Sequence, residues 1–240
     1  MDNTVTEMIN AFEEFASSTK QKNHRYLSWE HCYQQFRLVR LERDKKEPDL
    51  DYLSLQLAFY LASWGMYRGS SFLLQYDYTI HYSVVEEILK KEYDKLLGVE
   101  CKELNSEQTL LLLKKLNREI GGIYKHFRSN IGGKDIKQDI STTLVTKVLL
   151  GALGCVPAYD RFFVDAVKKN KVTTGNYNIS SLQKLIKFYE DHQEKLEKLR
   201  SEFLIKYEFE GKEKTLDYPQ MKLLDIGFWK IGFDLSEQVK

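Results

Sequence analysis

The chain has 240 residues, of which 42% are hydrophobic and 30% are charged, and its formal net charge at pH 7 is +1. This composition suits one compact domain with a substantial core, and the balanced charge excludes bulk electrostatic capture of nucleic acid, though not a local basic face. Three scattered cysteines form no CxxC or Cys/His cluster, so we expect no metal site and a reducing, cytoplasmic compartment. No leader sequence and no apolar run of about 18 residues occurs, so we expect neither a secretory signal nor a membrane span.

The chain contains only 3 Pro and 13 Gly among many Leu, Lys and Glu residues, which predicts an all-α fold. We expect about ten helices in a two-lobed globular bundle, as a single domain over 1–240 with lobes at 1–130 and 140–240. The first helix should carry a capping box of Thr4 and Glu7, and Ser28 should cap the second helix.

Residues 50–64 are apolar almost all round, which predicts the central, buried helix, ending at Gly65 or Gly69. One helix is expected from Ser83 to Leu97, and the next should start at Asn105 or Ser106. The Gly121-Gly122 pair inside that helix could kink it or admit another backbone. A polar, glycine-containing loop follows at 129–139.

The stretch 142–163 is the most informative part of the sequence. It predicts an apolar helix, a tight turn and a second helix that opens at Asp160. Ser180 should cap a long helix that reaches Phe203, and residues 206–216 should form a loop or a short hairpin, with no strand longer than a few residues. Pro219 should start the last helix.

Asp160 is the first candidate functional residue. A carboxylate where an apolar helix ends against a turn can lie at the mouth of a cleft and be held ionised by a helix N-terminus. The alternative is an acid that only caps the free amides of the helix.

The segment 114–137 has a large excess of cations, which include Arg128, Lys134 and Lys137. Cations beside a glycine-containing loop can seat a phosphate backbone. The alternative is a solvated helix face in a Lys-rich protein.

Residues 63–71 place two glycines around aromatic residues and an arginine, which predicts a base-stacking or anion site made by Trp64, Tyr67 and Arg68. The alternative is a helix corner with two left-handed glycines. His81 is expected to be a half-buried aromatic-type residue rather than a catalyst. No GxGxxG, P-loop, HExxH or GxSxG motif occurs, so no cofactor is expected and these enzyme classes have no support.

Residues 142–163 and 224–232 resemble the core of the helix-hairpin-helix DNA glycosylase superfamily. The match consists of the Thr146-Lys147 pair, the buried helix, the Val156-Pro157 turn, the acid Asp160, and a closing Asp…Trp…Gly helix at 224–232. It departs from the family because residues 141–145, just before the pair, contain no glycine.

The resemblance implies a DNA glycosylase-like hydrolase that excises damaged or modified bases, flipped into a pocket between two helical lobes. Asp160 would be the catalytic carboxylate, with Lys137 as a candidate amine nucleophile. DNA contacts would come from Lys134, Thr146, Lys147, Arg161 and Arg128, and Trp64, Tyr67 and Arg68 would line the base pocket. The alternative hypothesis is a non-catalytic helical protein that binds a protein partner, in bacterial stress or phage defence, and exposes an apolar patch.

Overall fold

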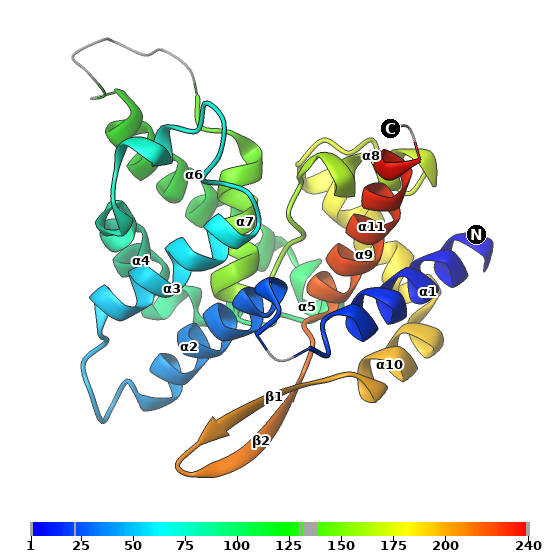
Figure 1. The fold of residues 1–240 in the computed structure, drawn as a ribbon, viewed down its shortest axis with the longest axis horizontal. Helices are drawn as coiled ribbons and strands as arrows, with labels where there is room; N and C mark the ends of the chain where they lie inside the picture. Colours follow the sequence, from blue (N-terminus) through cyan, green and yellow to red (C-terminus); the bar gives the residue numbers. More distant parts are fainter. Residues whose placement is uncertain (1, 22, 130, 132–138, 239–240) are drawn as a thin grey trace. The chain divides into compact units, whose positions relative to one another are not determined.

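The computed structural model describes residues 2–21, 23–129, 131 and 139–238 (Figure 1). In this part of the chain the fold is mostly α-helical, with ten α-helices of seven residues or more and one antiparallel hairpin. The predicted fold class is therefore confirmed. No described helix is both long and apolar enough to cross a membrane.

The chain divides into two compact units that each collect separated segments of the sequence. Unit 1 comprises Met1–His24, Gly98–Ser106 and Gly154–Lys240, and unit 2 comprises Arg25–Leu97 and Glu107–Leu153. The lobes predicted at 1–130 and 140–240 follow the chain in order, whereas these units alternate along it. The difference arises because the N-terminal helix packs with the C-terminal half of the chain.

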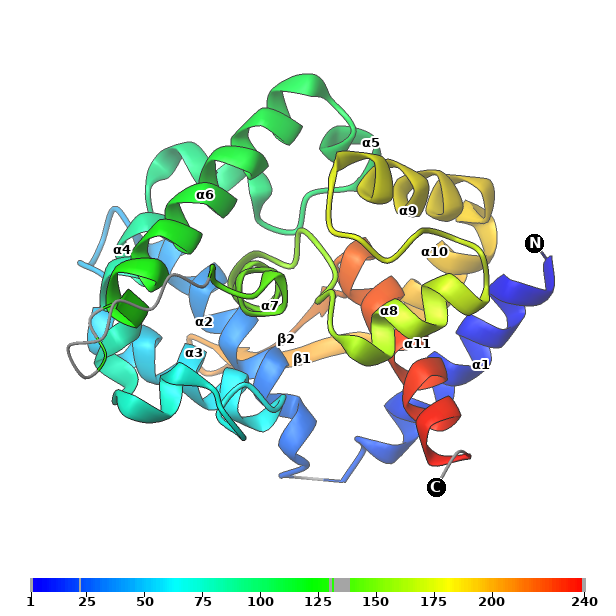
Figure 2. The same ribbon diagram turned by 90° about the horizontal axis from the view of Figure 1, so that it is seen from above.

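Unit 2 is built around α7 (Thr142–Leu153), which Figure 2 shows almost end-on. The helices α2 (Ser28–Glu42), α3 (Leu50–Ser63) and α6 (Glu107–Ser129) pack against it, and α4 (Tyr82–Ile88) packs on α3 and α6. Short 3₁₀ helices span Arg25–Leu27, Phe72–Gln75, Tyr78–His81 and Lys91–Leu96.

The central helix of unit 2 is α7, and the prediction that residues 50–64 are buried all round is wrong. Every residue of α7 from Leu144 to Leu153 is buried. In contrast, Tyr52, Leu55 and Phe59 on α3 are 43%, 47% and 56% exposed. They are spaced three and four residues apart, so they form one exposed apolar row along α3.

Unit 1 is built around α11 (Gln220–Glu237), which packs against both α1 (Asp2–Ser18) and α8 (Arg161–Lys169) (Figures 1 and 2). It also contains α5 (Cys101–Leu104), α9 (Ile179–Asp191), α10 (Gln193–Glu202) and the hairpin of β1 (Leu204–Phe209) and β2 (Lys212–Asp217). The hairpin alternative for residues 206–216 is confirmed. Its strands are six residues each, longer than expected.

Several predicted helix ends differ from those in the structure. α1 begins at Asp2, so Thr4 lies inside it, and its hydroxyl donates to Asn170 Oδ1 at 3.4 Å. Ser28 is the buried first residue of α2 and makes no capping bond. The predicted helix 83–97 continues as a separate 3₁₀ helix after Ile88, and the long helix after Ser180 breaks at His192.

Candidate active site around Asp160

Asp160 is the N-cap residue of α8. Its backbone is extended, and its carboxylate oxygen Oδ1 accepts a hydrogen bond from the Phe163 amide at 3.2 Å. Residues 154–159, which lead to it, are all buried, whereas Asp160 is half-buried. The carboxylate therefore caps the helix, as the alternative interpretation of the sequence expected, and the residue as a whole is partly exposed.

The backbone that carries Asp160 is held by a buried ion pair on α11. Asp225 Oδ1 accepts from the Ala158 amide at 2.8 Å, and Lys222 Nζ donates to Asp225 Oδ2 at 2.8 Å. Both charged side chains are only 2% exposed. Burial raises the pKa of Asp225, Lys222 opposes that shift, and the negative charge of Asp160 adds to it. Asp160 and Asp225 are therefore close enough to interact electrostatically.

A glycine on α11 brings that helix onto the start of α8. A Cβ atom at Gly232 would lie 1.9 Å from the carbonyl oxygen of Phe162, so only glycine permits this approach. One turn earlier, the Trp229 ring meets the Phe162 ring edge-on at 5.7 Å. Asp225, Trp229 and Gly232 lie on one face of α11 and together fix residues 158–162.

The position of the Asp160 carboxylate suits it to two chemical roles. An ionised carboxylate on a backbone anchored by buried contacts can stabilise a developing positive charge or accept a proton from water. Anchoring through backbone groups also limits the reorganisation that such a role would require.

The predicted DNA-contact residues lie in different environments. Thr146 and Lys147 are buried in α7, where the Thr146 hydroxyl donates to the Thr142 carbonyl at 2.9 Å and Lys147 Nζ donates to the Trp64 carbonyl at 2.6 Å. Their side chains are thus used inside unit 2 and are not presented to a phosphate backbone. Arg161 is exposed at the start of α8, with its guanidinium 4.8 Å from the Phe162 ring centre.

The described part of the basic segment is largely paired with acids. Lys115 binds Glu92, Arg118 binds Glu119, and Lys125 binds Asp139. Arg128 donates to the Asp139 carbonyl at 3.0 Å. These pairs favour the solvated-face alternative for α6. Lys134 and Lys137 lie outside the described residues.

Trp64, Tyr67 and Arg68 form the corner that follows α3. Trp64 is 9% exposed and its ring lies 4.6 Å from that of Tyr26. Arg68 is exposed, and its guanidinium folds back to within 3.2 Å of the position of a Cβ at Gly65, where φ is +79°. This geometry fits the helix-corner alternative.

Tyr67 belongs to a hydrogen-bond network of three side chains in unit 2 that the sequence did not reveal. The Tyr67 hydroxyl lies 2.8 Å from His81 Nε2, and His81 Nδ1 lies 2.7 Å from the Tyr124 hydroxyl. His81 is fully buried rather than half-buried, and burial lowers its pKa to about 3. The imidazole is therefore neutral and donates to one tyrosine while accepting from the other. Tyr124 is 43 residues away, so no local pattern could identify it.

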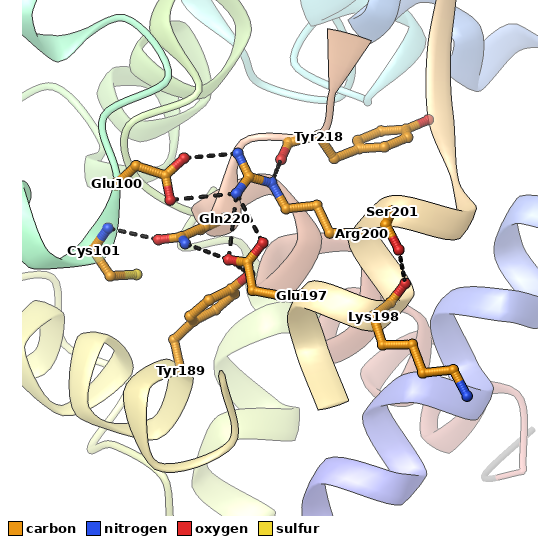
Figure 3. Close-up of polar contacts among 9 residues, drawn as sticks. All are labelled: Glu100, Cys101, Tyr189, Glu197, Lys198, Arg200, Ser201, Tyr218 and Gln220. Carbon is orange, nitrogen blue, oxygen red and sulfur yellow. Dashed lines mark hydrogen bonds and ion pairs between the residues drawn. The ribbon is translucent and has the colours of Figure 1, made fainter. Parts of the chain in front are cut away.

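A second polar cluster joins α5, α9, α10 and α11 in unit 1 (Figure 3). Arg200 lies between Glu100 and Glu197, with closest contacts of 2.7 and 3.1 Å. Glu197 also accepts from Tyr189 and Gln220. Burial would raise the pKa of Glu197, but these hydrogen bonds and Arg200 outweigh it and lower the pKa. With its oxygens so occupied, Glu197 is suited to hold the helices together rather than to act as a base.

Among the described residues, no group of three or more His, Cys, Asp or Glu side chains is arranged to hold a metal ion. No protein-family model matches this chain, and the comparisons with curated proteins and with solved structures found no similar protein.

Proposed function

We propose that this protein is a DNA glycosylase-like hydrolase in which Asp160 is the catalytic carboxylate. The observation that carries the proposal is the half-buried Asp160 at the N-terminus of α8, on a backbone that Asp225 holds at Ala158 and that Gly232 approaches closely at Phe162. The resemblance of residues 142–163 and 224–232 to the helix-hairpin-helix glycosylases supports it. In that resemblance Asp160 opens the helix after the turn, and Asp225 is the acid of the closing segment 224–232.

The reaction would be hydrolysis of the bond between a base and its deoxyribose. The base leaves with the electron pair of the C1′–N bond, and positive charge develops on the sugar. The Asp160 carboxylate stabilises that charge, or accepts a proton from the water whose oxygen bonds to C1′. Asp225, through the Ala158 amide, is a positioning residue in this scheme.

The test is single-turnover excision on duplex oligonucleotides that each contain one deaminated, alkylated or oxidised base. Asp160→Asn removes the charge but keeps a good N-cap acceptor, so the fold should persist. We expect the wild type to leave alkali-labile abasic sites on one base class, and Asp160→Asn to be slower by about 100-fold or more. Asp165→Asn, at an exposed position of the same helix, is the matched control and should leave the rate unchanged.

Equal rates for the wild type and Asp160→Asn would overturn the catalytic role. Absence of excision on every substrate would overturn the enzymatic proposal. DNA affinity measured over a salt series, with Arg161→Glu beside the wild type, separates binding from chemistry. Since the net charge is only +1, any binding must come from local cations and weaken steeply with salt.

A second candidate function is binding of a protein partner, and the exposed row of Tyr52, Leu55 and Phe59 on α3 favours it. Asp49 and Asp51 are exposed at the start of the same helix. The fitting partner is thus an amphipathic helix with basic residues beside its apolar face.

A labelled helical peptide that contains Leu and Lys should bind more tightly than the same peptide with Glu in place of Lys. The double variant Leu55→Ser/Phe59→Ser should abolish this difference in affinity. Equal affinity for both peptides would reject this partner.

A further inference from the structure

A cavity of about 450 Å³ lies in unit 1 at the C-terminal end of α8, the opposite end from Asp160. This volume is within the range of small-molecule sites. Its lining includes three lysines, one acid, an imidazole and apolar side chains, namely Lys171, Lys184, Lys187, Asp191, His192, Val172 and Phe188.

The cavity carries two positive charges that the protein does not compensate. Lys187 is paired with Asp191 at 2.9 Å, so that pair is neutral. Within the described part of the chain, neither Lys171 nor Lys184 forms an ion pair. Two uncompensated ammonium groups at one concave site match the double negative charge of a phosphate monoester.

Lys171 occupies a backbone position that normally favours glycine. Its φ is +55°, and it follows the C-cap residue of α8. Its amide donates to the Lys168 carbonyl at 3.0 Å, and the next amide, of Val172, donates to the Val167 carbonyl at 2.9 Å. This is a Schellman motif, in which a side chain at the left-handed residue is unfavourable. A lysine there weakens the helix end and adds a cation to the cavity.

The rest of the lining suits the organic part of a ligand. Phe188 is buried, and its ring lies 4.7 Å from that of His192. His192 Nδ1 is 2.8 Å from the Phe188 carbonyl oxygen, which can only accept, so Nδ1 carries the proton. The other ring nitrogen, Nε2, can then accept a hydrogen bond from a ligand hydroxyl.

Another cavity in unit 1, of about 270 Å³ beside α1 and α11, lacks this excess of positive charge. Its lining acids Glu7, Glu14 and Asp234 are paired with Lys169 or Lys230. The 450 Å³ cavity is therefore the stronger candidate for a charged ligand.

We infer that the 450 Å³ cavity binds a phosphate monoester, with Lys171 and Lys184 holding the phosphate and Val172 and Phe188 contacting the organic group. The site is independent of the proposed reaction at Asp160. The same phosphate chemistry is found in a free small molecule and at the 5′-phosphorylated end of a nucleic acid strand, so the experiment includes both.

The experiment is isothermal titration calorimetry of the full chain with adenosine monophosphate, ribose 5-phosphate, adenosine, and an oligonucleotide with or without a 5′-phosphate. We expect the phosphorylated small molecules to bind and adenosine not to bind. If only the 5′-phosphorylated oligonucleotide binds, and the cavity variants Lys171→Gly and Lys184→Gln weaken that binding, the ligand of the site is the phosphorylated end of a strand.

Two variants distinguish a ligand role from a structural one. Lys171→Gly should weaken phosphate binding by about tenfold without lowering the unfolding midpoint, because glycine suits the left-handed position. Lys184→Gln should weaken binding similarly, whereas Lys198→Gln on the exposed face of α10 should not. Absence of binding by every phosphate probe at millimolar concentration, or affinities unchanged in both cavity variants, would overturn the inference.

Discussion

At the scale of single residues, the buried pair of Lys222 and Asp225 shows how α11 orders the loop that carries Asp160. A buried ion pair is weak evidence of stability, because removing both charges from water costs about as much as their attraction returns. Its effect here is geometric. Asp225 accepts a hydrogen bond from the Ala158 amide, and the Lys222 ammonium opposes the rise in the pKa of Asp225 that burial causes.

We predict that Lys222→Met destabilises the protein by about 3–5 kcal/mol, because it leaves the Asp225 carboxylate buried without its cation. The double variant Lys222→Met/Asp225→Asn removes the charge but keeps an acceptor for the Ala158 amide, so it should recover most of the loss. Urea unfolding of the three proteins at pH 7 measures this. A double variant as unstable as Lys222→Met would contradict the electrostatic explanation.

At the scale of elements, the sequence predicted the helices that have a one-sided apolar pattern and missed contacts made across the chain. The helix α9 is an example, since one side of it is buried and the other is exposed. Its buried residues include Leu182, Leu185, Ile186 and Tyr189, and its exposed residues include Gln183, Lys184 and Lys187. Periodicity could not distinguish α3 from α7, because both segments are apolar on nearly every side. Only the tertiary structure decides that α7 is enclosed and α3 exposes a row.

At the candidate site, too, the position of Asp160 was predicted from its neighbours in the sequence, whereas its contacts with distant residues were not. Local pattern placed Asp160 at the start of a helix after a turn, and the structure agrees. The contacts that fix it come from Asp225 and Gly232, more than 60 residues later in the chain, and Gly232 matters because of the Phe162 carbonyl. A single sequence carries no signal of such a contact.

The turn of the β1–β2 hairpin has left-handed backbone conformations that two substitutions can test. Its two-residue turn, Glu210-Gly211, has φ values of +52° and +71°, and Phe209 pairs with Lys212. Asn tolerates this conformation better than Glu, so Glu210→Asn should stabilise the protein by about 0.5 kcal/mol. Gly211→Ala should destabilise it by about 1 kcal/mol through backbone strain alone, since nothing lies within 4 Å of the added Cβ. Thermal unfolding should show opposite shifts, and shifts of the same sign would argue against this turn geometry.

At the scale of the whole molecule, the two units depend on long-range contacts. Unit 1 combines the first helix with residues 98–106 and the C-terminal part of the chain, while unit 2 uses the intervening segments. Each unit also contains buried polar side chains, which make its stability sensitive to pH as well as to packing.

His81 determines one such pH dependence. Burial lowers its pKa from 6.5 to about 3 in the folded protein, so between these values the unfolded chain binds a proton that the folded chain excludes. The free energy of unfolding should therefore fall as the pH drops below about 6.5, by up to about 1.4 kcal/mol per pH unit. Its neighbours Tyr67 and Tyr124 do not titrate in this pH range, because burial raises the pKa of Tyr67 to about 12 and that of Tyr124 well above 10.

The variant His81→Gln keeps a hydrogen-bond donor and an acceptor but cannot titrate. The difference in unfolding free energy between the wild type and this variant should therefore shrink steadily from pH 7 to pH 5. A constant difference across that range, measured by urea unfolding, would show that His81 is already protonated in the folded protein or is not excluded from water.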